Sequence, residues 1–99
     1  MNKDDGMRVK IRTARALTHS MPEGKDIIEG QNLTVRGLIE ALVARYGDGL
    51  EKELLDQGNL RSGLSMLVNG RNILSLPEKY ETPLQDGDEV LIAIIVAGG

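Results

Sequence analysis

The stretch QDGDEVLIAIIVAGG, residues 85–99, decides the fold of this sequence. It begins with Asp86, Gly87 and Asp88, residue types that favour a tight reversal of the chain. An uninterrupted apolar run over residues 90–96 then predicts a strand with apolar side chains on both faces. Two glycines follow, although glycine has no side chain that could be buried. The last strand therefore leads into residues whose role is not core packing.

A hairpin is predicted before the main helix. Alternation of apolar and polar side chains over residues 7–13 indicates a half-buried strand. Pro22 and Gly24 mark a connection, after which residues 26–30 form a short return strand. We therefore expect two antiparallel strands at the start of the fold.

The clearest helix covers residues 35–46, where apolar side chains recur at spacings of three and four. Thr34 stands at the N-cap position, where its hydroxyl can accept a hydrogen bond from the first turn. Gly47 follows the last turn and suits the left-handed conformation that often ends a helix. The side chains expected to pack on the sheet are Leu38, Ile39 and Leu42.

Three segments connect this helix to the last strand. Residues 48–58 predict a short helix or helical turn. Its inward side chains are expected to be Leu50, Leu54 and Leu55. Residues 63–73 predict two strands joined at Asn69-Gly70, because this dipeptide favours the positive φ angles of a tight turn. Residues 76–84 are expected to be mostly irregular.

The order of these elements is two strands, a helix, a short helix and three strands, and it predicts the α+β class. The layout is that of a β-grasp, or ubiquitin-like, fold, in which one main helix packs on one face of a mixed sheet. The first and last strands should be parallel neighbours, since the helix crosses between two hairpins. We expect the domain at residues 7–96, a disordered extension at residues 1–6 and a flexible tail at residues 97–99.

Composition excludes several classes of function. The 99 residues suffice for one core, and the net charge of −3 argues against a nucleic-acid partner, which usually requires a basic excess. The sequence has no cysteine, so it offers no disulfide, thiolate ligand or cysteine nucleophile. With His19 as the single histidine, we expect no metal site. No segment has the length of a membrane span, so we expect no membrane partner and a cytoplasmic location.

Three motifs resemble those of the bacterial and archaeal sulfur-carrier proteins with the ubiquitin-like fold. They are VNGRNI at residues 68–73, TPLQDGDEVLI at residues 82–92 and the terminal VAGG at residues 96–99. The resemblance covers residues 7–99 and is most specific at the tail. This family includes the small subunit of molybdopterin synthase and the sulfur carriers of thiamine and cysteine synthesis.

The resemblance implies that the C-terminus is the reacting group. An E1-like adenylating enzyme would use ATP to convert the carboxylate of Gly99 to an acyl-adenylate, and a persulfide would then leave a thiocarboxylate. Gly98 and Gly99 would be the catalytic positions, and their lack of a Cβ would let the tail enter a narrow pocket. The chain would be a protein cosubstrate and not an enzyme. It would bind no cofactor itself, because the partner uses the ATP.

The resemblance also suggests a pathway. The leading interpretation is molybdenum or tungsten cofactor synthesis, in which the chain would be the non-catalytic small subunit of molybdopterin synthase and pass sulfur to the large subunit. However, IAIIVAGG at residues 92–99 lacks the aromatic residue and prolines typical of those small subunits. Residues 54–70 form a longer segment than in the shortest thiamine carriers. The alternatives are a sulfur carrier that serves an acceptor enzyme of cysteine or thiamine synthesis, a ubiquitin-like modifier joined to lysines, and a binding module without C-terminal chemistry.

Side chains before the tail are expected to contact these partners. Val90 and Ile92 should face the helix, which leaves the opposite face of the last strand as a docking patch. The residues assigned to partner binding are Leu91, Ala93, Ile95, Val96 and Ala97. Alternatively, parallel pairing and loop cover would bury both faces. The first strand carries a row of basic side chains, which are Arg8, Lys10 and Arg12. This row is either a solvated face of the sheet or a basic stripe that steers an acidic partner.

Overall fold

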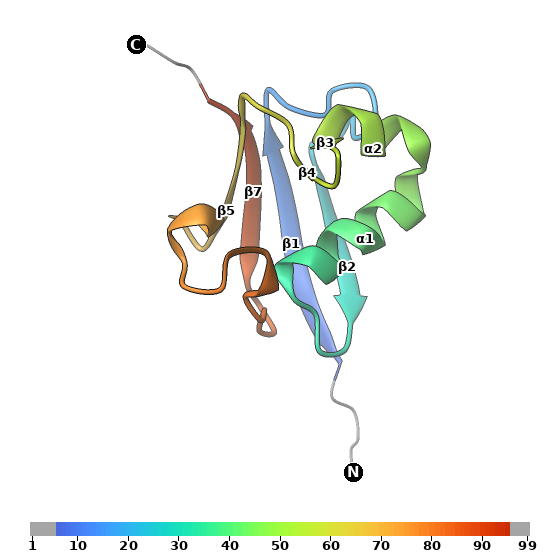
Figure 1. Ribbon diagram of the computed structural model, residues 1–99. Helices are drawn as coiled ribbons and strands as arrows, with labels where there is room; N and C mark the ends of the chain where they lie inside the picture. Colours follow the sequence, from blue (N-terminus) through green and yellow to red (C-terminus); the bar gives the residue numbers. More distant parts are fainter. Residues whose placement is uncertain (1–5, 96–99) are drawn as a thin grey trace.

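Strands β1 (Met7–Ala14) and β7 (Glu89–Ile94) lie side by side and parallel at the centre of a five-stranded sheet. The computed structural model describes residues 6–95. Strand β2 (Lys25–Gly30) pairs antiparallel with β1, whereas β5 (Leu64–Val68) and β6 (Arg71–Asn72) extend the sheet beyond β7. The order β2-β1-β7-β5-β6 confirms the predicted hairpins and the parallel central pair (Figure 1).

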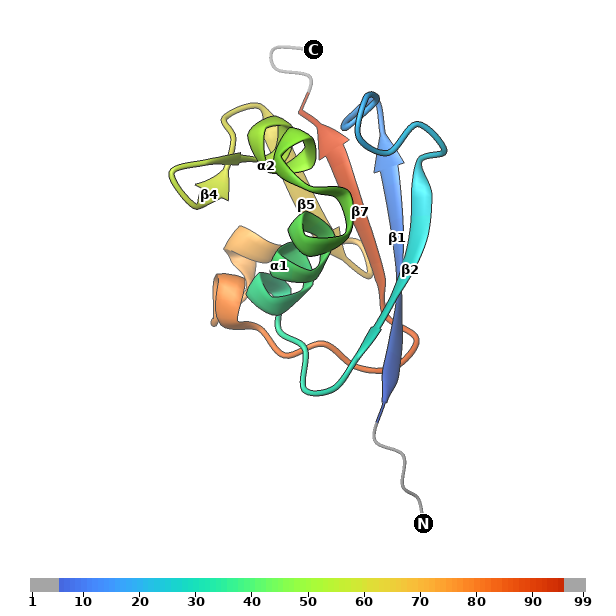
Figure 2. The same cartoon turned by 90° about the vertical axis from the view of Figure 1, so that its right-hand side faces the viewer.

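Two helices cover one face of this sheet (Figure 2). Helix α1 (Val35–Tyr46) has the predicted bounds, and the Thr34 hydroxyl accepts a hydrogen bond from the Gly37 N–H at 3.0 Å. Helix α2 (Asp48–Leu54) follows directly, because Gly47, with a φ of +86°, ends α1 and redirects the chain. The predicted α+β class and the packing of one main helix on one face are confirmed.

The hydrophobic core lies between the helices and the sheet. Leu38 and Leu42 of α1 are fully buried, and Ile39 is 3% exposed, as predicted. The inward side chains of the three central strands are equally well buried: Val9, Ile11, Met66, Val90 and Ile92. The sequence contains no Phe or Trp, so aliphatic side chains and methionine supply the apolar burial that drives folding.

The segment after α2 differs from its prediction. The helix predicted over residues 48–58 is too long, because β3 (Leu55–Asp56) and β4 (Asn59–Leu60) form a short hairpin. The two residues between these strands, Gln57 and Gly58, have φ angles of +54° and +86°. Positive φ at both positions is what a two-residue hairpin turn requires, so the turn ends the helical stretch.

The predicted inward side chains of this segment are only partly correct. Leu50 and Leu54 are fully buried on α2. Leu55 is half-buried, because it opens β3 after the helix has ended. The prediction is therefore confirmed for Leu50 and Leu54, whereas Leu55 packs against the core from β3 and is only half-buried.

The chain between β5 and β7 matches its prediction. Asn69 and Gly70 form the tight turn, with φ angles of +50° and +85°. One turn of 3₁₀ helix, η1 (Ile73–Ser75), follows β6, and a second turn, η2 (Lys79–Glu81), lies within the otherwise irregular residues 76–84. Across residues 6–95, none of the helices is both long enough and apolar enough to span a membrane.

Candidate functional site at the exit of the last strand

Strand β7 carries the chain out of the sheet. Its last residue, Ile94, lies opposite Leu64 of β5. The next residue is also held, because the Ile95 N–H donates to the Gly63 carbonyl oxygen at 2.8 Å. Since β1 and β7 are parallel, the chain leaves the sheet at the end opposite to the start of β1 (Figure 1). The candidate site is this exit and the surfaces around it.

The tail residues predicted to react lie outside the described residues. They are Val96, Ala97, Gly98 and Gly99. Residues 1–5 of the predicted N-terminal extension also lie outside the described residues, and only Gly6 of that extension is described. The roles given to the tail and the domain boundaries at residues 6 and 96 therefore stay predictions.

Within residues 6–95, no helix covers the face of the sheet opposite α1 and α2 (Figure 2). Leu91 and Ala93 of β7 are half-buried on this open face, and Ile95, just beyond the strand, is 51% exposed. Val90 and Ile92 point toward the helices and are 1% and 0% exposed. The predicted division of β7 into two faces is confirmed, while partner binding to the open face stays a prediction.

The open face contains residues that sequence reasoning did not place beside the patch. Leu67 of β5 lies opposite Leu91 and is also half-buried. On the other side of β7, Arg12 lies opposite Leu91, and Lys10 lies opposite Glu89. The alternation in β5 indicates that Leu67 faces outward, but only the register reveals its neighbour. We call Leu67, Leu91 and Ala93 the open-face patch.

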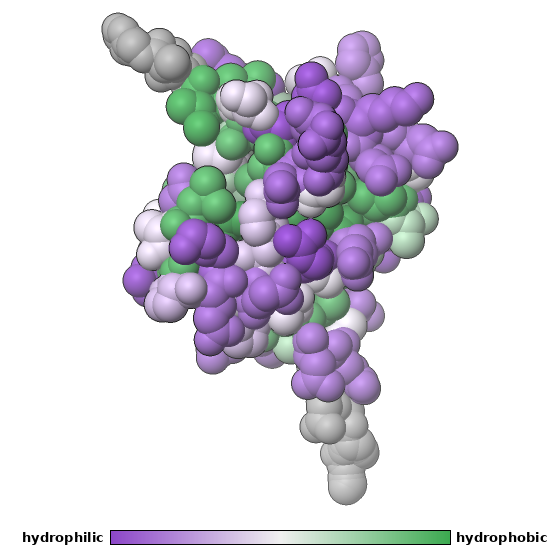
Figure 3. All heavy atoms as spheres, in the orientation of Figure 1, coloured by the Kyte–Doolittle hydropathy of each residue, from purple (hydrophilic) through white to green (hydrophobic). Residues whose placement is uncertain are grey.

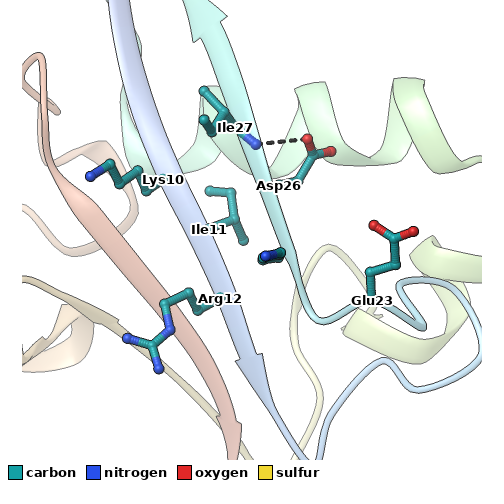
Figure 4. Close-up of a pocket in the computed structure, with 7 residues that line it drawn as sticks. Lys10, Ile11, Arg12, Glu23, Asp26 and Ile27 are labelled. Carbon is teal, nitrogen blue, oxygen red and sulfur yellow. Dashed lines mark hydrogen bonds between the residues drawn. The ribbon is translucent and has the colours of Figure 1, made fainter.

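The predicted basic stripe lies on this same face. Figure 4 shows Lys10 and Arg12 pointing away from the carboxylate of Asp26. In the part of the chain that the structure describes, neither of these two cations forms an ion pair. Arg8 contacts Glu29 at 3.4 Å, but both side chains are about two-thirds exposed, so this pair contributes little to stability. Steering of an acidic partner by the stripe stays a prediction.

Exposed apolar side chains also gather where β7 leaves the sheet (Figure 3). Ile94 is 47% exposed and Ile95 is 51% exposed. Ile94 has the same parity as the inward residues Val90 and Ile92, yet it lies beyond the end of the core and is not covered. Because consecutive residues of an extended chain point to opposite sides, exposed aliphatic surface lies on both sides of the exit.

Asp26 ties the end of α1 to the edge strand β2. Its carboxylate accepts hydrogen bonds from Arg45 Nη1 at 3.0 and 2.9 Å and from the Tyr46 hydroxyl. Burial raises the pKa of Asp26, but the hydrogen bonds from Tyr46, the Ile27 N–H and Arg45 outweigh it and hold that pKa below its ordinary value of 3.8. The same hydrogen bond raises the pKa of Tyr46. This cluster stabilises the fold and is not a free acid–base pair.

Glu53 of α2 fastens the loop between β1 and β2. Its Oε1 accepts hydrogen bonds from the Ser20 N–H at 3.0 Å and from the Ser20 hydroxyl. The bond from the hydroxyl lowers the pKa of Glu53 against the opposing effect of burial. Beside this contact an open cleft of about 480 Å³ extends to Ile94 at the exit of β7. Sequence reasoning missed this cleft because its walls come from segments far apart in the chain.

The sequence and the fold are similar to those of known small proteins. Residues 12–99 match the ThiS family. A protein of Archaeoglobus fulgidus described as a sulfur carrier is 41% identical over 93 residues, which cover 94% of this chain and 100% of that protein. Small archaeal modifier protein 3 of Haloferax volcanii is 38% identical over 66 residues, 67% of this chain and 70% of that protein.

A solved structure confirms the fold. The solution structure of small archaeal modifier protein 1 from Methanosarcina acetivorans superimposes with a TM-score of 0.76 at 26% sequence identity. The match covers 97% of this chain and 100% of that protein. The β-grasp architecture predicted from the order of elements is therefore correct.

Proposed function

Because the chain belongs to the ThiS family, we propose that it is a sulfur carrier that reacts through the carboxylate of Gly99. In this proposal Gly99 is the last residue of the chain. The observation that carries the proposal is the position of β7, which is held in the middle of the sheet and is followed by a backbone hydrogen bond at Ile95. Val90 and Ile92 fix this strand in the core, so the strand can anchor a reactive tail.

A carboxylate must be activated before it can accept sulfur, because it has no good leaving group. An E1-like adenylating enzyme joins the Gly99 carboxylate to the α-phosphate of ATP and releases pyrophosphate. A persulfide sulfur then attacks the acyl carbon and displaces AMP, and a thiol reduces the sulfur–sulfur bond to leave the thiocarboxylate. The chain supplies the electrophile, and the partner supplies the ATP site and the catalytic groups.

The length of the tail limits where the partner can bind. Four residues follow Ile95, and at about 3.3–3.6 Å per residue they reach about 13–14 Å. The partner must therefore lie close to the exit of β7 for Gly99 to enter its active site. Gly98 and Gly99 have no Cβ, so a narrow pocket can admit them.

The open-face patch is the proposed docking surface for that partner. Leu67, Leu91 and Ala93 provide a half-buried apolar area beside the exit, and Ile95 adds an exposed aliphatic side chain. The predicted partner-binding residues Val96 and Ala97 continue from it along the tail. The adenylating enzyme and the sulfur acceptor use this surface in turn, since both must reach the same carboxylate.

The large subunit of molybdopterin synthase is the first acceptor to test. The likeness of the terminal VAGG to the small subunit of that enzyme supports this choice. The thiocarboxylated chain would be incubated separately with the large subunit and with the acceptor enzymes of cysteine and thiamine synthesis. Loss of sulfur from the chain only with the large subunit supports molybdopterin synthesis, whereas transfer only to another acceptor contradicts it.

A second candidate function is a protein modifier joined to lysine side chains. The 38% identity to small archaeal modifier protein 3 favours it. Both functions begin with the same adenylate and differ in the nucleophile, which is a persulfide sulfur in one and a lysine amine in the other. Mass spectrometry of cell extracts distinguishes them, because a modifier yields peptides in which Gly99 is joined to a lysine and a carrier yields free thiocarboxylate.

The chemistry at Gly99 is tested by intact-mass spectrometry. The chain is incubated with the adenylating enzyme, ATP and a sulfur donor, and should gain the mass difference between sulfur and oxygen. Deletion of Gly99, or addition of one residue after it, should prevent this gain, because a displacement of even about 1 Å can slow a reaction about a hundredfold. Urea unfolding should be unchanged in both variants. Equal conversion of all three chains contradicts the proposal.

A further inference from the structure

The cleft beside Ile94 has a surplus of positive charge. Its lining includes Arg15, Lys52 and Arg61 but only one carboxylate, that of Glu53. This local charge is opposite in sign to the net charge of −3 of the whole chain. The single carboxylate is already engaged by two hydrogen bonds from Ser20. We call this feature the exit cleft.

The three cations come from different parts of the chain. Arg15 follows β1, Lys52 belongs to α2, and Arg61 lies between β4 and β5. The Arg61 Nη1 donates to the Lys52 carbonyl oxygen at 3.4 Å, which keeps these two residues together. The fold brings them to one end of the sheet, because Ala14, just before Arg15, lies opposite Ala93 near the end of β7.

These cations have no acidic partner among residues 6–95. All three are exposed, and none belongs to an ion pair in that part of the chain. By contrast, Arg8, Arg36 and Arg45 each lie within 3.4 Å of a carboxylate oxygen. The charges of the exit cleft are therefore available to an external acidic group.

The loop that forms one wall of the cleft holds an unusual conformation. Arg15 and Leu17 have φ angles of +60° and +55°, which side chains other than glycine rarely adopt. Leu17 is nonetheless 4% exposed, and the bond between Ser20 and Glu53 fixes the loop to α2. Strain of this kind persists only where the surroundings enforce it, and it is concentrated at functional sites.

We propose that the exit cleft is a docking site for an acidic segment of the enzyme that acts on the tail. This inference rests on the proposed function, because a tail that reaches only about 13–14 Å beyond Ile95 obliges the enzyme to cover the exit. Three free cations favour acidic side chains in that segment. Half-buried Leu64 and exposed Ile94 line the same cleft, so an aliphatic residue between the acidic ones completes the match.

A peptide titration tests the site without using the chemistry of the tail. The probe is the acetylated, amidated peptide Asp-Glu-Leu-Glu-Asp, added to the full ¹⁵N-labelled chain in low salt and followed by NMR. We expect shifts at the amides of residues 15–18, 52–53, 61–64 and 94. The peptide Asn-Gln-Leu-Gln-Asn, which lacks the charges, should produce no shifts. Shifts elsewhere, or none with the acidic peptide, overturn the proposal.

Neutralising single cations inside and outside the cleft distinguishes binding in the cleft from non-specific electrostatic attraction of the peptide. Lys52→Gln and Arg61→Gln should each weaken peptide binding about two- to fivefold, the effect of losing one exposed ion pair. Arg71→Gln is the control, because Arg71 is exposed on β6 and does not line the cleft. Equal weakening by all three variants would mean non-specific attraction and would overturn the proposal. The amide spectrum of each variant verifies its fold.

Two further titrations test which kind of ligand the exit cleft binds and whether binding depends on the tail. Inorganic phosphate should not shift the same amides as strongly as the peptide, and an equal response would make the cleft a small-anion site instead of a peptide site. The chain without Gly99 should bind the peptide as tightly as the full chain. If the peptide binds but Gly99 is not converted in the intact-mass experiment, the proposed chemistry at Gly99 is contradicted and the docking site is still supported.

Discussion

Arg12 and Leu91 lie directly opposite each other on the parallel strands β1 and β7. Their pairing places the basic stripe and the open-face patch on one surface, on the side of β7 opposite to the buried side chains Val90 and Ile92. Charges around an apolar contact accelerate encounter with a complementary partner, whereas the apolar centre supplies affinity. The two features, which the sequence presents separately, can therefore act on the same partner.

Replacing Leu91 by Asp should weaken binding of the adenylating enzyme by about tenfold or more. The substitution removes an apolar side chain from the open-face patch and places a carboxylate opposite Arg12, where it offsets a charge of the basic stripe. A tenfold loss of affinity corresponds to about 1.4 kcal/mol. Isothermal titration calorimetry measures the change in affinity.

The control for this variant is Leu74→Asp. Leu74 is 54% exposed on η1, away from β7, so the same substitution there should leave the affinity unchanged. A folded Leu91→Asp variant that binds like the wild type would show that the open-face patch is not the docking surface.

Replacing Leu42 by Ala should lower the free energy of unfolding by about 2–5 kcal/mol. Leu42 is fully buried between α1 and the sheet, and the truncated side chain would leave a cavity. Urea unfolding measures the loss. Leu74→Ala, at an exposed position, should change stability by no more than about 0.5 kcal/mol, and a similarly small effect at Leu42 would contradict the described core.

The substitution Asp26→Asn should lower stability at neutral pH by about 1 kcal/mol, because hydrogen bonds to a charged acceptor become bonds to a neutral one. The pKa of Asp26 lies below its ordinary value of 3.8 in the folded state. Its contribution is therefore present above pH 3.8 and is lost as the pH falls through the folded pKa. The stabilities of wild type and variant should converge in acid.

Thermal unfolding between pH 2 and pH 7 follows this convergence. The control is Glu29→Gln, which removes the exposed partner of Arg8 and should have an effect below about 1 kcal/mol at every pH. A constant difference between wild type and Asp26→Asn across the range would mean that the charge of Asp26 is not the source of stability.

Two glycines should respond to alanine in opposite directions. Gly37→Ala should raise the free energy of unfolding by about 0.5–1 kcal/mol, because a Cβ in α1 would meet its nearest neighbour at an ordinary 3.5 Å. Gly70→Ala should lower it by about 1–2 kcal/mol, because Gly70 has a φ of +85° in the turn before β6. Chemical denaturation distinguishes these signs, and a destabilised Gly37→Ala would contradict the packing around α1.

The sequence by itself determined the elements and the faces that they bury. The bounds of α1, the turn at Asn69-Gly70 and the two faces of β7 all follow from it. Each depends on residues that are close in the chain: a period of 3.6 or 2, a cap, or a dipeptide that tolerates positive φ. The hairpin at residues 55–60 also depends on residues close in the chain. The sequence does not predict it, because Gln57 is not a usual turn residue.

Only the tertiary structure decided which of these faces lie together. Periodicity tells which way Leu67, Leu91 and Arg12 point, but it carries no information about the strand that each one faces, because pairing joins residues far apart in the chain. The register of β7 with β1 and β5 unites them on one surface. The exit cleft arises in the same way, since Lys52 and Arg61 meet Arg15 only after the sheet and α2 have packed.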